Sequence, residues 1–116
     1  MKIEILSIPV ADQERAIGFY EKIGFKKIND YIFGENMRWV ELTLGSETNI
    51  VLVNWFPEMP AGSIHGLIIK VKNIFEKHKD LTKKGIEINP IFDTPWGRFA
   101  NFTDLDGNGW SLREIN

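Results

Sequence analysis

The chain has 116 residues, of which 43% are hydrophobic and 26% charged, with a net charge of −2 and no cysteine. This composition is typical of a single globular domain and excludes collagen-like, disordered and low-complexity chains. The charge balance argues against nucleic acid or an anionic membrane as a partner, and the cysteine count excludes disulfide frameworks and thiol catalysis. Because neither a signal-peptide pattern nor a run of membrane-spanning length is present, we expect a cytoplasmic protein.

The first half of the chain predicts one strand, one helix and three further strands. The β-branched segment at residues 3–8 favours a strand. Asp12 then has the side chain and position of a helix N-cap, and Gly24 is placed to end that helix. Extended segments are expected at residues 25–33, 37–44 and 49–55.

After a linker at residues 57–63, which contains two prolines and a glycine, the same order of elements begins again. A strand is expected at residues 64–71, followed by a helix and three more extended segments. Equivalent positions are 61 residues apart, namely Val10 and Val71, Asp12 and Asn73, and Gly24 and Gly85. The sequence therefore predicts an α+β fold of two βαβββ modules, residues 1–56 and 64–116, within one domain. A single α+β unit without a repeat is the alternative.

Two segments carry a family resemblance. Residues 10–25 contain Val-Ala-Asp, then Arg-Ala-Ile-Gly-Phe-Tyr and Ile-Gly-Phe. Residues 93–108 contain Asp-Thr-Pro-Trp-Gly-Arg and later Asp-Leu-Asp-Gly-Asn. Both resemble signatures of the vicinal-oxygen-chelate superfamily, which includes glyoxalase I, extradiol dioxygenases and bleomycin-resistance proteins. The resemblance implies a curved mixed sheet, or cup, with the helices on its outer face, and a homodimer that binds a small molecule.

Metal-dependent members of this superfamily take their ligands from four strands that line the cup. The matching positions in this chain are Ile5, Leu52, Gly66 and Ser111. None of them carries the imidazole or carboxylate that a divalent transition metal prefers. We therefore expect no metal and no cofactor, as in the metal-free bleomycin-resistance-like proteins.

One alternative is a metal-dependent lyase or dioxygenase with unusual ligands. Its ligands would be His65, Glu41 and Glu114. His65 lies one residue before the matching position, so strand alternation points it away from the cup. A β-bulge would be needed to turn it inward.

Strand alternation also predicts which residues line the cup. The apolar side chains expected beneath the helices are Leu6, Ile8, Val40, Leu42, Leu44, Val51, Val53 and Trp55. The opposite face then carries the candidate ligand-binding residues Ile5, Ser7, Trp39, Glu41, Leu52, Asn54, Phe99, Asn101, Ser111 and Arg113, with Trp96 at the rim. An apolar concavity with a few polar groups is typical of a small-molecule pocket. For Trp39 and Trp96, stacking on a flat ligand and a purely structural role are equally open.

These observations favour a metal-independent protein that binds or sequesters a small, partly apolar molecule. The sequence assigns no catalytic residue.

Overall fold

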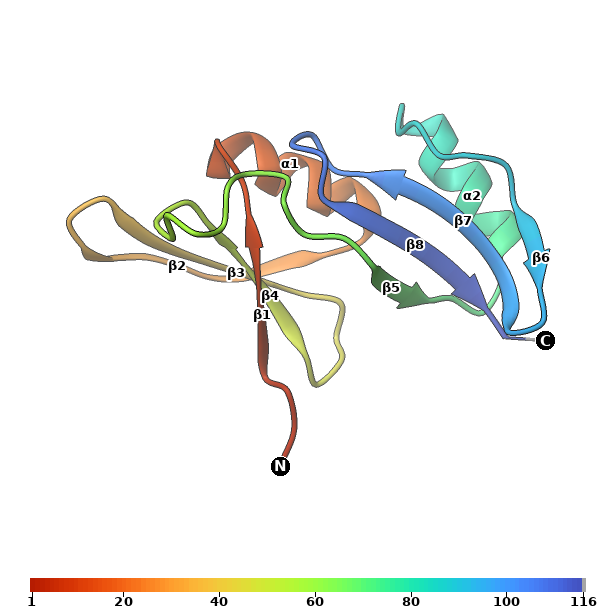
Figure 1. The fold of residues 1–116 in the computed structure, drawn as a ribbon, viewed down its shortest axis with the longest axis horizontal. Coiled ribbons are helices and arrows are strands. Elements are labelled where there is room, and N and C mark those ends of the chain that lie inside the picture. The colour runs from red at the N-terminus through yellow and green to blue at the C-terminus, as the bar shows by residue number, and fades with distance from the viewer. Residues whose placement is uncertain (116) are drawn as a thin grey trace. The chain divides into compact units, whose positions relative to one another are not determined.

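The computed structural model describes residues 1–115, which form two compact units (Figure 1). Unit 1 comprises Met1–Ile64 and Leu105–Asn108, and unit 2 comprises His65–Asp104 and the segment from Gly109. Each unit contains a four-stranded mixed sheet and one helix, in the chain order βαβββ. The predicted α+β fold with two βαβββ modules is confirmed.

Unit 1 contains β1 (Ile5–Pro9), α1 (Gln13–Ile23), β2 (Lys26–Gly34), β3 (Met37–Thr43) and β4 (Asn49–Val53). The strand order is β1-β4-β3-β2, with β1 parallel to β4 and the other neighbours antiparallel. Helix α1 packs against β2 and β4 and so covers one face of this sheet. The side chains between helix and sheet are buried: Ile8, Ala16, Tyr20, Ile23, Val40, Leu42, Ile50 and Leu52.

Unit 2 contains β5 (Leu67–Lys70), α2 (Ile74–Lys83), β6 (Phe92–Thr94), β7 (Gly97–Thr103) and β8 (Gly109–Glu114). The strand order is β5-β8-β7-β6, with β5 parallel to β8. Helix α2 packs against β7 and β8 (Figure 1). Its core side chains are Ile74, Leu81, Ala100, Phe102, Trp110 and Leu112.

Both helices begin where the sequence predicts. The Asp12 and Asn73 side chains each accept a hydrogen bond from the amide three residues later, at 3.2 and 3.1 Å. Such caps satisfy amide groups that have no partner inside the helix. Gly24 and Gly85 follow the last turns with φ angles of +127° and +83°, which glycine adopts without a steric penalty. The repeat predicted from these positions is therefore present in the structure.

Three predicted strands end earlier or begin later than expected. β5 starts at Leu67 rather than at residue 64, because Gly66 has a φ of +83° and interrupts the extended chain. β4 ends at Val53, and β3 ends at Thr43 before an exposed turn. Leu44 is 41% exposed, so its predicted burial under α1 is wrong.

The turn between β7 and β8 has a structural role within unit 1. Asn108 is fully buried; its Nδ2 donates to the Pro9 carbonyl at 2.8 Å, and its Oδ1 accepts from the Ile64 amide at 3.1 Å. Gly107 adopts a φ of +103° beside it. The Asp-Leu-Asp-Gly-Asn motif is thus explained by hydrogen bonding and turn geometry. Within residues 1–115, neither helix is long and apolar enough to cross a bilayer.

Candidate ligand-binding site

The register of β4 decides which residues lie on the face of the unit 1 sheet opposite α1. Leu52 pairs with Val40 and with Ile8, and it is fully buried on the helix side. Val51 pairs with Glu41 and with Ser7. Directly paired residues project from the same face, so the predicted face of Leu52 is wrong.

The face of the unit 1 sheet opposite α1, here called the unit 1 open face, is defined by these pairings. It brings together the predicted residues Ile5, Ser7, Trp39 and Glu41. The pairings add Asn29, Tyr31, Asn49, Val51 and Val53, which were not among the predicted site residues. Asn54 lies beyond the end of β4 and is exposed.

An aromatic cluster occupies the end of the unit 1 open face that lies on the β2–β3 hairpin. Tyr31 and Trp39 stack with ring centroids 6.4 Å apart and an interplanar angle of 22°. Phe33 makes edge contacts with Trp39 and with Trp55, at 6.1 and 5.3 Å. Tyr31 and Phe33 are 52% and 47% exposed. The predicted core role of Trp55 is wrong, since this side chain is half-buried in the cluster.

Glu41 lies beside this cluster and holds it by a hydrogen bond. Its Oε1 accepts from the Trp39 indole at 3.0 Å and from Asn29 at 3.2 Å, and its Oε2 accepts from Asn49 at 2.8 Å. Burial raises the pKa of the Glu41 carboxyl, but the three hydrogen bonds outweigh it and leave the pKa below its ordinary value. The open face therefore presents an ionised carboxylate next to exposed aromatic rings.

The face of the unit 2 sheet opposite α2 carries the remaining predicted residues. Phe99 pairs with Arg113, and Asn101 pairs with Ser111, so these four side chains share one face. The Ser111 hydroxyl donates to Asn101 Oδ1 at 2.6 Å, and the Arg113 guanidinium lies 5.8 Å from the centre of the Phe99 ring. A shallow hollow of about 310 Å³ lies at this face, with Gly66, Asn101 and Ser111 in its lining.

Trp96 is 69% exposed in the turn between β6 and β7. Its carbonyl accepts a hydrogen bond from Arg113 Nε at 3.0 Å, so its backbone is fixed while its ring is free to contact solvent. The phenyl ring of Phe92 on β6 stacks on Phe99 with centroids 6.0 Å apart. Unit 2 thus presents an apolar surface around one guanidinium.

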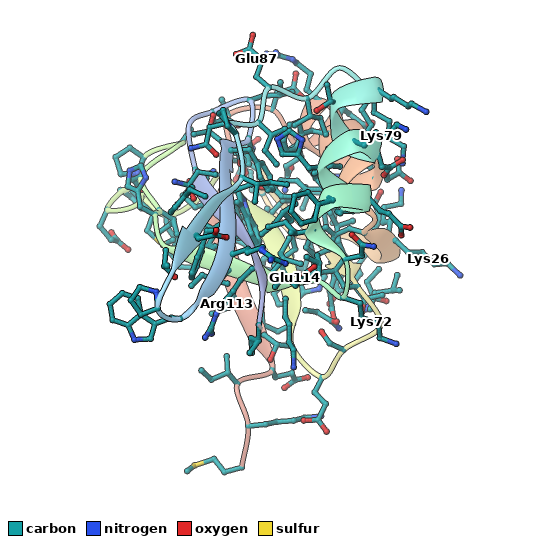
Figure 2. All side chains as sticks on the ribbon, turned by 90° about the vertical axis from the view of Figure 1, so that its right-hand side faces the viewer. Lys26, Lys72, Lys79, Glu87, Arg113 and Glu114 are labelled. Carbon is teal, nitrogen blue, oxygen red and sulfur yellow. The ribbon has the colours of Figure 1, made fainter. Side chains whose placement is uncertain are left out.

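Within residues 1–115, the three side chains proposed as alternative metal ligands do not come together as a metal site. Glu114 projects toward α2, where Oε2 accepts from the Ile74 amide at 2.8 Å and Oε1 contacts Arg98 at 3.0 Å. Figure 2 shows Glu114 on the α2 side of β8 and Arg113 on the other side. His65 lies before the first residue of β5, so no β-bulge in this strand turns its side chain inward. Its imidazole ring lies against Gly109.

The described residues do not assemble a metal-binding cluster. Within residues 1–115, no group of three or more His, Asp or Glu side chains is placed to hold an ion. The pairing of β4 with β3 puts Val51, and not Leu52, at the position where metal-dependent relatives take a ligand from this strand. Valine, like leucine, has no donor atom for a metal. Among residues 1–115, the strand positions that match metal ligands therefore offer no imidazole or carboxylate.

The missed residues left a weak signal in the sequence. Tyr31 and Phe33 alternate with Ile32 in a segment that was predicted to be a strand, which is the pattern of one aromatic face. Asn49 and Val51 could not be placed because residues 50–53 are all apolar and alternation gives no information there.

Comparison with known proteins gives consistent matches over the full chain. A profile of the Glyoxalase/Bleomycin resistance protein/Dioxygenase superfamily matches residues 2–112. The uncharacterized protein YetH of Bacillus subtilis strain 168 is 30% identical over 120 residues, covering 97% of this chain and 98% of that protein. TnmS3, an antibiotic binding protein from Streptomyces sp. CB03234, is 37% identical with a TM-score of 0.95, covering 100% of this chain and 97% of TnmS3. A superfamily member from Sphaerobacter thermophilus DSM 20745 is 33% identical with a TM-score of 0.88, covering 98% and 97% of the two chains.

Proposed function

Since the chain belongs to the Glyoxalase/Bleomycin resistance protein/Dioxygenase superfamily, we propose that it binds a small, partly apolar molecule reversibly and without a metal ion. The superfamily scaffold carries both enzymes and binding proteins, so the residues of the site must decide between them. The observation that carries the proposal is the exposed aromatic cluster beside Glu41 on the unit 1 open face.

The shape of this cluster favours a flat ligand. Tyr31, Phe33 and Trp39 expose ring surface whose burial by a planar molecule is favourable. TnmS3, which is 37% identical to this chain over 97% of its own length, is an antibiotic binding protein. We infer that the ligand of this chain is likewise a small organic molecule of antibiotic size.

The side chains available support the proposal of metal independence. The open faces place Ile5, Val51 and Ser111 where a metal-dependent relative would need imidazole or carboxylate donors. Glu41 is already engaged by three donors, which reduces its capacity as a metal ligand. The residues therefore support sequestration of the ligand rather than metal-assisted chemistry.

We also propose that both units act together as one domain and that the chain forms a homodimer. Each open face carries aromatic and polar side chains of its own, which supports this proposal: Ile5, Ser7, Trp39 and Glu41 in unit 1, and Phe99, Asn101, Ser111, Arg113 and Trp96 in unit 2. The exposed edge strand β2 supports pairing with a second copy.

A fluorescence titration with 9-anthracenemethanol, a neutral planar probe, tests this function. We expect saturable binding of the intact probe, recovery of the probe unchanged after incubation, and the same affinity before and after dialysis against a chelator. Trp39→Ala should weaken binding about tenfold or more, because it removes the ring that Tyr31 and Phe33 contact. The melting temperature should fall by less than about 8 °C, since Trp39 is only half-buried.

Phe75→Ala is the matched control for this titration. Phe75 is a 56% exposed aromatic residue on α2 of unit 2 and is not part of the unit 1 open face, so its removal should leave probe affinity unchanged. Conversion of the probe, or a stoichiometric metal whose removal abolishes binding, would contradict the proposed function.

A further inference from the structure

The acceptor atoms on the unit 1 open face are not all used by the protein. An ionised carboxylate has about four lone-pair sites for hydrogen bonds. Glu41 Oε1 accepts from both Trp39 and Asn29, whereas Oε2 accepts only from Asn49 among the described residues. One acceptor position on Oε2 is therefore available to a ligand.

Asn49 adds a second acceptor without a donor. Its Nδ2 donates to Glu41, so the amide orientation is fixed, because a carboxylate oxygen can only accept here. Within residues 1–115, the buried Oδ1 of Asn49 has no hydrogen-bond partner. Leaving a buried acceptor unpaired costs free energy, so the polar groups around Glu41 are not fully satisfied within the described residues.

The Glu41 carboxylate adjoins the aromatic cluster directly. The Trp39 indole that donates to Glu41 is the ring that stacks on Tyr31. A flat ring lying on this cluster would hold a substituent at its edge close to the carboxylate. The electron-rich faces of Trp39 and Tyr31 attract a cation as well.

We propose that the unit 1 open face selects planar aromatic cations whose N–H groups donate to Glu41 Oε2. The proposal rests on the proposed function, since it names the class of ligand for the same site. The low pKa of the Glu41 carboxyl supports it, because the negative charge persists at neutral pH. Neutral planar molecules bind through stacking alone, and planar anions are repelled.

Three probes of similar size and different charge separate these contributions. They are 9-aminoacridine, which is protonated at neutral pH, the neutral 9-anthracenemethanol, and the anionic 9-anthracenecarboxylate. We expect the cation to bind about tenfold more tightly than the neutral probe, as a charge-assisted hydrogen bond would give. The anion should bind more weakly than either.

Glu41→Gln removes the charge while keeping the size of the side chain and an oxygen that can accept from Trp39. It should reduce the ratio between the affinities for the cation and for the neutral probe from about ten to about one, whatever the change in the affinity for the neutral probe itself. Glu47→Gln is the matched control, because Glu47 is exposed in the turn between β3 and β4 and its loss changes net charge equally. The Glu47→Gln variant should keep the preference for the cationic probe over the neutral probe.

The outcomes distinguish this proposal from the function on which it rests. If all three probes bind equally, or if Glu41→Gln keeps the preference for the cation, the charge selectivity is wrong and the binding function stands. If no probe binds, both are wrong.

Discussion

At the scale of single residues, the guanidinium of Arg38 joins three elements of unit 1. Its Nη1 lies 2.6 Å from Glu14 on α1, and its Nη2 lies 2.7 Å from Asp30 on β2. Arg38 Nε also donates to Asp30 at 2.8 Å, which makes the pair bidentate. Hydrogen bonds from Arg38, and then from Lys27, hold the pKa of the Asp30 carboxyl well below its usual range.

Asp30→Asn should therefore make stability less dependent on pH. Because the pKa of Asp30 is lower in the folded state, its carboxylate contributes stability fully above the unfolded-state pKa, and this contribution is lost as pH falls toward the folded value. We expect the substitution to reduce the free energy of unfolding by about 1 kcal/mol at neutral pH. The difference in free energy of unfolding between the Asp30→Asn variant and the parent chain should become smaller below about pH 4. Urea unfolding at a series of pH values measures both effects.

Asp93→Asn is the control for this comparison. Asp93 also pairs with an arginine, Arg98, but at 3.3 Å and with its side chain 81% exposed. A surface pair of this kind contributes little, so its loss should change stability by less than about 0.5 kcal/mol. Equal effects of the two substitutions would contradict the role given to Asp30.

At the scale of elements, the two helix caps are equivalent positions of the repeat. Asp12→Ala and Asn73→Ala should each reduce the free energy of unfolding of the intact chain by about 1 kcal/mol, because each removes the acceptor of a helix amide. The exchanges Asp12→Asn and Asn73→Asp should change it by less than about 0.5 kcal/mol, since both residue types cap well. Chemical unfolding of the four variants measures this, and an alanine variant as stable as the parent would show that its cap is dispensable.

The helices were predictable from sequence because their ends depend on local chemistry. A capping side chain and a glycine with positive φ act within a few residues, so Asp12, Gly24, Asn73 and Gly85 could be interpreted without knowing their neighbours. The alternation in β3 likewise placed Trp39 and Glu41 correctly on one face.

The faces of β4 were not predictable in the same way. Four consecutive apolar residues, 50–53, fit either face, and only the pairing with β1 and β3 decides between them. All four are buried. The partners of Glu41 on the unit 1 open face, Asn29 and Asn49, come from different strands, so their convergence depends on register rather than on any local pattern.

At the scale of the whole molecule, β2 is the feature that supports a second copy as partner. It is the outermost strand of the unit 1 sheet, and its hairpin with β3 extends beyond the residues that pair with β4 (Figure 1). Ile28 and Ile32 are 44% and 79% exposed on this strand. An exposed apolar edge strand is a template for pairing with another chain, and a homodimer would cover it by a symmetric contact.

Light scattering coupled to gel filtration tests the proposed homodimer. We expect a mass of twice the 13.4 kDa chain, falling toward the single chain on dilution. Ile32→Lys should shift the equilibrium to the monomer, because it places a charge in the apolar contact. Leu105→Lys makes the same change at a 53% exposed position in the turn between β7 and β8, and it should leave the dimer intact. A parent chain that remains monomeric at every concentration would contradict the dimer, and two variants that dissociate equally would place the contact elsewhere than β2.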